Sequence, residues 1–141
     1  MPTSDEQLRA RLRDLEDEAR TLADVEVETY EGTTISTVHV DPRSPAARSM
    51  SWTDLGDELI LEVGTHGGRW ELELNEGAIA FLEDVVRSVM AGRVRETFGR
   101  GRSRVEVTLA DGSSAVETGY VSWLPTPGWK KRGRVVQYGP Y

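Results

Sequence analysis

Two histidines are the residues of this chain that most readily exchange protons near neutral pH. His39 lies in a stretch of β-branched residues, and His66 lies in a glycine-rich segment between Gly64 and Gly68. Histidine is the commonest general base in enzymes, but it acts only with a nucleophile or substrate group placed beside it. Neither histidine belongs to a motif that supplies one. We expect His39 to be a partly buried strand residue and His66 an exposed turn residue.

Asp54, Asp57 and Glu58 surround Gly56 and offer oxygen atoms of the kind that hard cations prefer. Their spacing is not that of a calcium-binding loop, which alternates its ligands and ends in a bidentate glutamate. The chain has no cysteine, which excludes thiolate catalysis, disulfides and sulfur-based zinc sites. The sequence therefore predicts a solvated turn at Gly56, with no cofactor, no metal and no enzymatic activity.

Basic residues are concentrated in the C-terminal third of the chain. Gly99 to Arg102 is superficially similar to a phosphate-binding loop, but it lacks the third glycine and the following helix, so a hairpin turn is expected. The basic residues of this C-terminal third favour nucleic acid as a partner. A sequence pI near 4.9 opposes that interpretation. The run comprises Arg93, Arg95, Arg100, Arg102 and Arg104, followed later by Lys130, Lys131, Arg132 and Arg134.

Charge is divided unevenly between the two parts of the chain. Residues 1–92 carry eight arginines and twenty acids, a net −12, whereas residues 93–141 carry nine basic and four acidic residues, a net +5. An acidic surface suits a basic partner protein, because complementary charge speeds association. The candidate contacts on that surface are the acidic residues of the N-terminal helix and the outward strand residues Glu26, Glu28, Glu71 and Glu73.

Two tryptophans flank two prolines between Trp123 and Trp129. Prolines stiffen a loop, and tryptophan is enriched among the residues that dominate binding energies. The alternative is that both indoles fold back over the edge of the core, because tryptophan is highly buried on average. Trp123 and Trp129 therefore join the candidate partner-binding residues, together with Arg100 and Arg102.

Two helices are predicted from apolar residues at helical spacing. Ser4 and Gln7 have the spacing of a capping box, which predicts a helix over residues 5–23. Its leucine stripe either packs on its own domain or joins two copies. A second helix is expected over residues 76–91, capped by Asn75 and closed by Gly92 in the left-handed conformation.

Most of the remaining chain alternates apolar and polar residues, which is typical of strands with one buried face. Runs near residues 25–30, 34–40, 59–63, 70–74, 94–98, 105–109, 116–120 and 134–138 follow this pattern, and residues 41–49 contain two prolines and are expected to form a loop. Tight turns such as Asp111-Gly112 imply antiparallel pairing. The sequence predicts a single α+β domain over residues 1–141, a mainly antiparallel sheet with both helices on one face. Its core residues should include Trp70, Leu72, Val105, Val107 and Leu109.

The stretch from Ala91 to Tyr141 resembles a pattern in small uncharacterised actinobacterial proteins. The resemblance lies in Ala91-Gly92-Arg93-Val94, Val105 to Gly112, Glu117-Thr118-Gly119 and Pro127-Gly128-Trp129. It implies no established activity. Arginine greatly exceeds lysine while asparagine and isoleucine are scarce, a bias that agrees with a high-GC bacterial genome.

The residues up to Leu15 alternate acids, arginines and leucines and form no secretory signal, and no apolar run is long enough to span a membrane, so we expect a cytoplasmic protein. The sequence favours a small protein-binding domain without catalytic activity, monomeric or dimeric. The narrower hypothesis is an immunity protein that neutralises a basic toxin domain. The alternative is a nucleic-acid-binding or regulatory protein that uses the basic C-terminal cluster.

Overall fold

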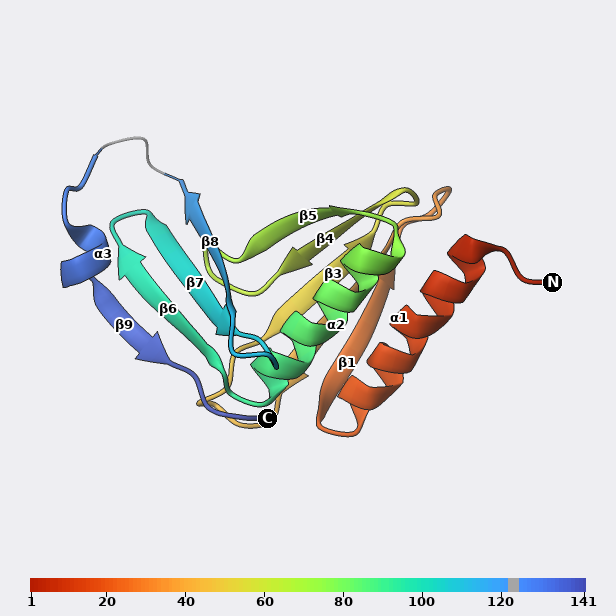
Figure 1. Ribbon diagram of the computed structural model, residues 1–141, viewed down its shortest axis with the longest axis horizontal. Coiled ribbons are helices and arrows are strands. Elements are labelled where there is room, and N and C mark those ends of the chain that lie inside the picture. The colour runs from red at the N-terminus through yellow and green to blue at the C-terminus, as the bar shows by residue number, and fades with distance from the viewer. Residues whose placement is uncertain (122–124) are drawn as a thin grey trace.

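The computed structural model describes residues 1–121 and 125–141, which fold as an α+β domain with two antiparallel sheets (Figure 1). The first sheet is a meander in chain order: β1 (Ala23–Thr29), β2 (Ser36–Pro42), β3 (Met50–Asp54), β4 (Glu58–Glu62) and β5 (Arg69–Glu73). The second sheet has the order β8–β7–β6–β9 and contains β6 (Val94–Gly99), β7 (Arg102–Thr108), β8 (Ser114–Tyr120) and β9 (Arg134–Gln137). The helices are α1 (Ser4–Arg20), α2 (Glu76–Met90) and the short α3 (Trp129–Arg132).

Helix α1 begins one residue earlier than the capping motif predicts. The Thr3 side chain accepts a hydrogen bond from the Glu6 amide at 3.2 Å, and the Glu6 carboxylate accepts one from the Thr3 amide at 2.6 Å. The capping box is therefore Thr3–Glu6, and the prediction of Ser4–Gln7 was wrong. Both pairs have the required spacing, but only Thr3 takes the extended backbone that a cap needs. The helix also ends at Arg20, before the predicted residue 23.

Helix α2 lies where the two sheets meet. In the view of Figure 1, the first sheet lies behind the helix and the second sheet lies to its left. Asn75 caps it, accepting from the Ala78 amide at 2.8 Å, and Gly92 follows it at φ +80°, both as predicted. Fully buried side chains point from α2 in several directions: Ile79, Leu82, Val85, Val86 and Val89. Because both sheets contact the helix, it is buried on more sides than an ordinary amphipathic helix.

The strands after α2 form a sheet of their own and do not extend the first sheet. Val105 and Val107 are fully buried, and Trp70, Leu72 and Leu109 pack partly buried against the same core. Trp70 meets Phe81 of α2 edge to face, with ring centroids 5.9 Å apart. The predicted core is thus confirmed. Strand β3 and the short helix α3 were missed by the sequence analysis.

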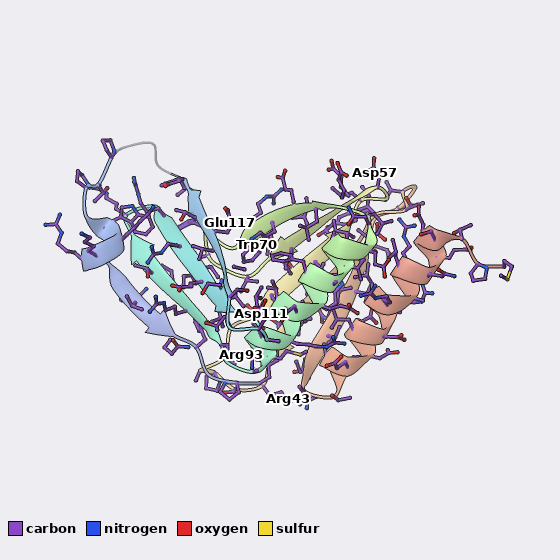
Figure 2. All side chains as sticks on the ribbon, viewed as in Figure 1. Arg43, Asp57, Trp70, Arg93, Asp111 and Glu117 are labelled. Atoms are coloured by element: carbon purple, nitrogen blue, oxygen red, sulfur yellow. The ribbon has the colours of Figure 1, made fainter. Side chains whose placement is uncertain are left out.

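The two sheets are joined by the turn between β4 and β5. The Ser103 hydroxyl accepts from the amides of His66 and Gly67, at 3.1 and 2.8 Å, and the Gly68 amide donates to the Glu117 carbonyl at 3.2 Å. Trp70 of β5 and Glu117 of β8 mark this junction in Figure 2. His66 is half-buried here, so the expected exposed turn is instead a packed inter-sheet contact.

Candidate functional site

The four glutamates predicted to bind a partner lie on one face of the first sheet. In the strand register Glu26 and Glu28 oppose His39 and Thr37, while Glu71 and Glu73 oppose Ile60 and Glu58. Strand residues alternate between faces, so all of these side chains point away from the apolar face that meets the helices. We call this surface the acidic face. Its exposed carboxylates are Asp24, Glu26, Glu28, Asp41, Glu58, Glu62, Glu71 and Glu73.

A few cations within or beside the acidic face offset part of its charge. Arg69 pairs with Glu62 at 2.6 Å and with Glu71 at 3.5 Å, and Arg43 pairs with Asp24 at 3.5 Å. The His39 ring nitrogen Nε2 lies at hydrogen-bond distance, 3.0 Å, from a Glu28 carboxylate oxygen. These pairs are exposed, and exposed pairs are screened by water and contribute little to stability. In the described ranges no ion pair reaches Glu26 or Glu73. The surface therefore keeps an excess of negative charge.

The acidic face spreads its carboxylates along the sheet and does not gather them into a chelate. Among the described residues no group of three or more histidine and acidic side chains could hold a metal ion. Asp54, one of the three acids around Gly56, is instead held by Arg9 of α1 through hydrogen bonds of 2.8 and 3.3 Å. Hydrogen bonding to Asp54 raises the pKa of Arg9. This turn is thus a docking point for α1.

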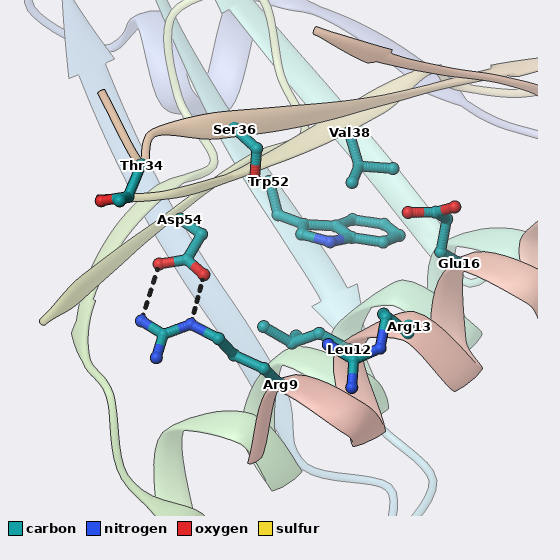
Figure 3. Close-up of a pocket in the computed structure, with 9 residues that line it drawn as sticks. All are labelled: Arg9, Leu12, Arg13, Glu16, Thr34, Ser36, Val38, Trp52 and Asp54. Atoms are coloured by element: carbon teal, nitrogen blue, oxygen red, sulfur yellow. Dashed lines mark hydrogen bonds and ion pairs between the residues drawn. The ribbon is translucent and has the colours of Figure 1, made fainter. Parts of the chain in front are cut away.

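A groove of about 540 Å³ lies beside this ion pair, between α1 and the apolar face of β2 and β3 (Figure 3). Leu12, Val38 and the Trp52 indole form its apolar part. Arg13 and Glu16 line its helix side. A groove of this kind accommodates apolar side chains with a polar rim. The sequence does not predict this groove, because Thr34, Ser36 and Val38 come beside α1 only through the tertiary fold.

The basic candidates are separated by the fold. Arg100 is exposed at the turn between β6 and β7, whereas Arg102 is only 5% exposed. Arg102 Nε donates to the Arg100 carbonyl at 3.0 Å, and its guanidinium lies over the Tyr120 ring at 5.3 Å. The structure therefore places Arg100, but not Arg102, where a partner could reach it.

Of the two candidate tryptophans, Trp129 is buried and Trp123 lies outside the described residues. Trp129 begins α3 and packs against Gly99, where an added Cβ would come within 2.8 Å of the indole. Lys130 lies over the Trp129 ring at 6.0 Å. Trp129 thus packs on the end of β6, so this indole is buried and offers no exposed anchor.

Glu96 is a fully buried carboxylate that the sequence analysis did not single out. It accepts from the Tyr138 hydroxyl at 2.8 Å and the Thr65 amide at 2.7 Å, and Arg48 Nε lies 3.9 Å away. No pattern in the sequence marks it, since a glutamate in an alternating strand is ordinarily exposed. Its partners come from distant segments, so we assign it a structural role at the sheet junction.

Comparison with protein-family models, curated proteins and solved structures gives no match. In the part of the chain that the structure describes, no helix has the length and apolarity needed to cross a membrane.

Proposed function

We propose that this domain binds a basic protein through the acidic face, without catalysing a reaction. The observation that carries the proposal is a helix-free sheet face from which carboxylates project into solvent on every strand except β3. Helices α1 and α2 pack on the opposite face of the sheet, and no helix among the described residues packs on the acidic face. A surface of this kind attracts and orients a cationic partner over several ångströms.

One feature of the acidic face favours binding over a purely structural role. Glu58 and Glu73 are direct cross-strand neighbours on β4 and β5. Like charges directly opposite in a sheet are destabilising, by roughly 0.2–1 kcal/mol on the scale of cross-strand pairs. A local cost of this kind is expected where a surface serves a partner, because natural sequences depart from local optima mainly at functional sites. A basic partner would relieve the repulsion on binding.

The narrower form of the proposal is an immunity protein that blocks a basic toxin domain in the bacterial cytoplasm. A compact acidic domain can cover a cationic active surface, and electrostatic steering gives the rapid capture that neutralisation requires. The support is the acidic face, whose exposed carboxylates lie on four of the five strands of the first sheet. A nucleic-acid partner, in contrast, would bind the positively charged residues of the second sheet.

The test compares three double variants that each remove two negative charges. Glu26→Gln with Glu28→Gln and Glu71→Gln with Glu73→Gln alter the acidic face, and Asp14→Asn with Asp17→Asn alters exposed positions of α1. The full-length protein is first used to isolate its partner from native cells by cross-linking. Association of the purified pair is then measured at low and high salt. We expect each face variant to slow association by ~3-fold or more at low salt, and the helix variant much less.

Folding should survive in all three variants, since exposed substitutions usually change stability by ~0.5 kcal/mol or less each. Equal slowing by the α1 variant would show that net charge alone matters and that the acidic face is not the docking surface. Nuclease treatment separates the alternative function: if the captured material is nucleic acid and binding depends on Arg100, the proposal is wrong.

A further inference from the structure

The first sheet ends in an open edge at β1. In the described residues β1 pairs only with β2, and the order of the sheet places no strand on its other side. An open edge presents unpaired amide and carbonyl groups that can pair with another extended chain.

The register identifies the outward-pointing backbone groups. Ala23 opposes Pro42, which has no amide hydrogen, so this cannot be a pair that exchanges two hydrogen bonds. Pairs alternate in type along an antiparallel ladder, and therefore Val25, Val27 and Thr29 also direct their amide and carbonyl groups away from β2. Arg20 confirms the direction, because its guanidinium reaches the Val25 carbonyl at 3.2 Å from outside the sheet. The free part of the edge is thus Val27 to Thr29.

The edge is poorly suited to a second copy of this chain. An antiparallel pairing of two β1 strands about a two-fold axis centred on Glu26 would place Glu26 opposite Glu26 and Asp24 opposite Glu28. Directly opposed like charges destabilise a sheet. Acidic residues on an edge strand are also a common means of preventing edge-to-edge association. The same residues would favour a strand of opposite charge.

The two faces of β1 differ in chemistry, so they select different side chains on an incoming strand. On the acidic face an added strand would meet Asp24, Glu26 and Glu28. On the opposite face it would meet Val27, which is 44% exposed and pairs with Val38, one of the residues lining the groove in Figure 3. Side chains alternate between faces at every residue. The edge therefore fits a strand with basic residues at one set of positions and apolar residues at the other.

We propose that β1 receives an extended segment of a partner protein, with alternating basic and apolar residues, as an additional strand of the first sheet. The inference rests on the proposed function and names the contact through which the acidic face holds its partner. Main-chain hydrogen bonds to Val27 and Thr29 would fix the register, and the alternating side chains would provide specificity.

The probe is a short synthetic peptide in which lysine alternates with valine and threonine. One control peptide has the same composition with the lysines grouped at one end, and another carries N-methyl groups on the amides of alternate residues. We expect the alternating peptide to bind the intact protein and to protect the Val27 and Thr29 amides from hydrogen exchange. Methylating the amides that face β1 should weaken binding by about ten-fold or more, because the ladder cannot form. Grouping the lysines should also weaken binding by about ten-fold or more, because alternate lysines then point away from the acidic face.

On the protein side, Val27→Pro removes an outward amide at an edge position, where proline is tolerated. Val27→Thr is the matched control, since it keeps the amide and the β-branched shape. Strand addition at β1 predicts that Val27→Pro abolishes peptide binding and that Val27→Thr does not. It also predicts that Glu26→Gln with Glu28→Gln weakens peptide binding more than Glu71→Gln with Glu73→Gln. If the proline variant does not fold, the methylated peptides decide.

The outcomes separate this inference from the function on which it rests. If all basic peptides bind alike, regardless of pattern or methylation, and every face variant weakens them equally, the acidic face acts diffusely and strand addition is wrong. If the isolated partner binds through the acidic face but leaves the Val27 amide unprotected, the same conclusion follows and the proposed function stands. If neither partner nor peptide depends on the face variants, both are wrong.

Discussion

Glu96 shows how a buried charge is made tolerable in this fold. A carboxylate removed from water is costly unless hydrogen bonds and an opposite charge replace its hydration. Thr65 and Tyr138 supply the hydrogen bonds and Arg48 supplies the charge, from three different segments. Arg48 also lies over the Tyr138 ring at 5.7 Å and donates to the Val63 carbonyl at 2.6 Å. The cluster therefore ties the loop after β2 and the C-terminal residues to β6.

Tyr138 is expected to make the folded protein less stable as the pH becomes alkaline. Burial, followed by its hydrogen bond to Glu96, raises the pKa of Tyr138 from 10.0 to about 12. Because the folded state holds this proton more tightly than the unfolded state, the stabilisation is complete below pH ~10 and is lost as pH rises towards ~12. Burial also raises the pKa of Tyr141. We expect the free energy of unfolding to fall by about 1 kcal/mol over this range for Tyr138, after allowing for its partial exposure.

Urea unfolding of the wild type and of Tyr138→Phe between pH 8 and pH 12 measures this effect. The phenylalanine variant should be less stable at pH 8, because Glu96 loses a donor, and should lose less stability on going to pH 12. An equal alkaline loss in both proteins would show that Tyr138 does not contribute to it.

At the level of elements, the turn between β4 and β5 depends on glycine at the point of contact. Gly119 of β8 has no room for a side chain, because an added Cβ would lie 1.8 Å from the His66 carbonyl oxygen. Gly119→Ala should therefore push the turn off the second sheet and break the bonds to Ser103. We expect a loss of about 2–4 kcal/mol in thermal or urea unfolding, on the scale of overpacked cores.

Gly77→Ala in α2 is the matched control for this substitution. An added Cβ there would meet only Asn75 Oδ1, at an ordinary 3.5 Å, and alanine is the better helix former. Its stability should be unchanged or higher by up to ~1 kcal/mol. If Gly119→Ala is equally benign, the two sheets are not held together by this turn.

Local signals were sufficient for most of the elements. Asn75 and Gly92 mark the two ends of α2, and the Asp111-Gly112 turn joins β7 to β8. These features could be predicted because caps and tight turns depend on residues only a few positions apart. Strand β3 was missed because Ser51, Thr53 and Asp54 give its short run little apolar alternation. The division into two sheets was also missed. It depends on contacts such as Ser103 with Gly67, which join segments far apart in the chain.

The candidate site was predictable in part for the same reason. Alternation along β1 and β5 was enough to direct Glu26, Glu28, Glu71 and Glu73 outward. It could not show that both strands belong to one sheet, nor that Glu58 and Glu62 join them between the edges. Burial of Arg102 was not predictable from the sequence, because it arises from packing at the ends of β6 and β7. Burial of Trp129 was one of the two alternatives that the sequence offered, and the contact of its indole with Gly99 of β6 selects it. The sequence thus predicts side-chain direction within a strand better than the surface that strands make together.

At the scale of the whole molecule, the uneven charge of the chain becomes a separation in space. Strands β1 to β5 come entirely from the acidic residues 1–92, and β6 to β9 entirely from the basic residues 93–141. Figure 1 shows the second sheet at one end of the molecule and α1 at the other. The two charge-biased parts of the sequence are therefore not interleaved by folding.

This separation gives the molecule an electric dipole moment, and a dipolar particle has an orientation-dependent attraction to its own kind. The basic end of one molecule can approach the acidic end of the next, a head-to-tail contact that has no symmetry to close it and so favours open chains over defined dimers. We expect light scattering to show net attraction between molecules at low ionic strength, despite a net charge of −7, and its disappearance near 0.15 M salt, where the Debye length falls to about 8 Å. Purely repulsive behaviour at every salt concentration would contradict this. Colloidal stability, as distinct from folding stability, is then the property that the division into two sheets controls.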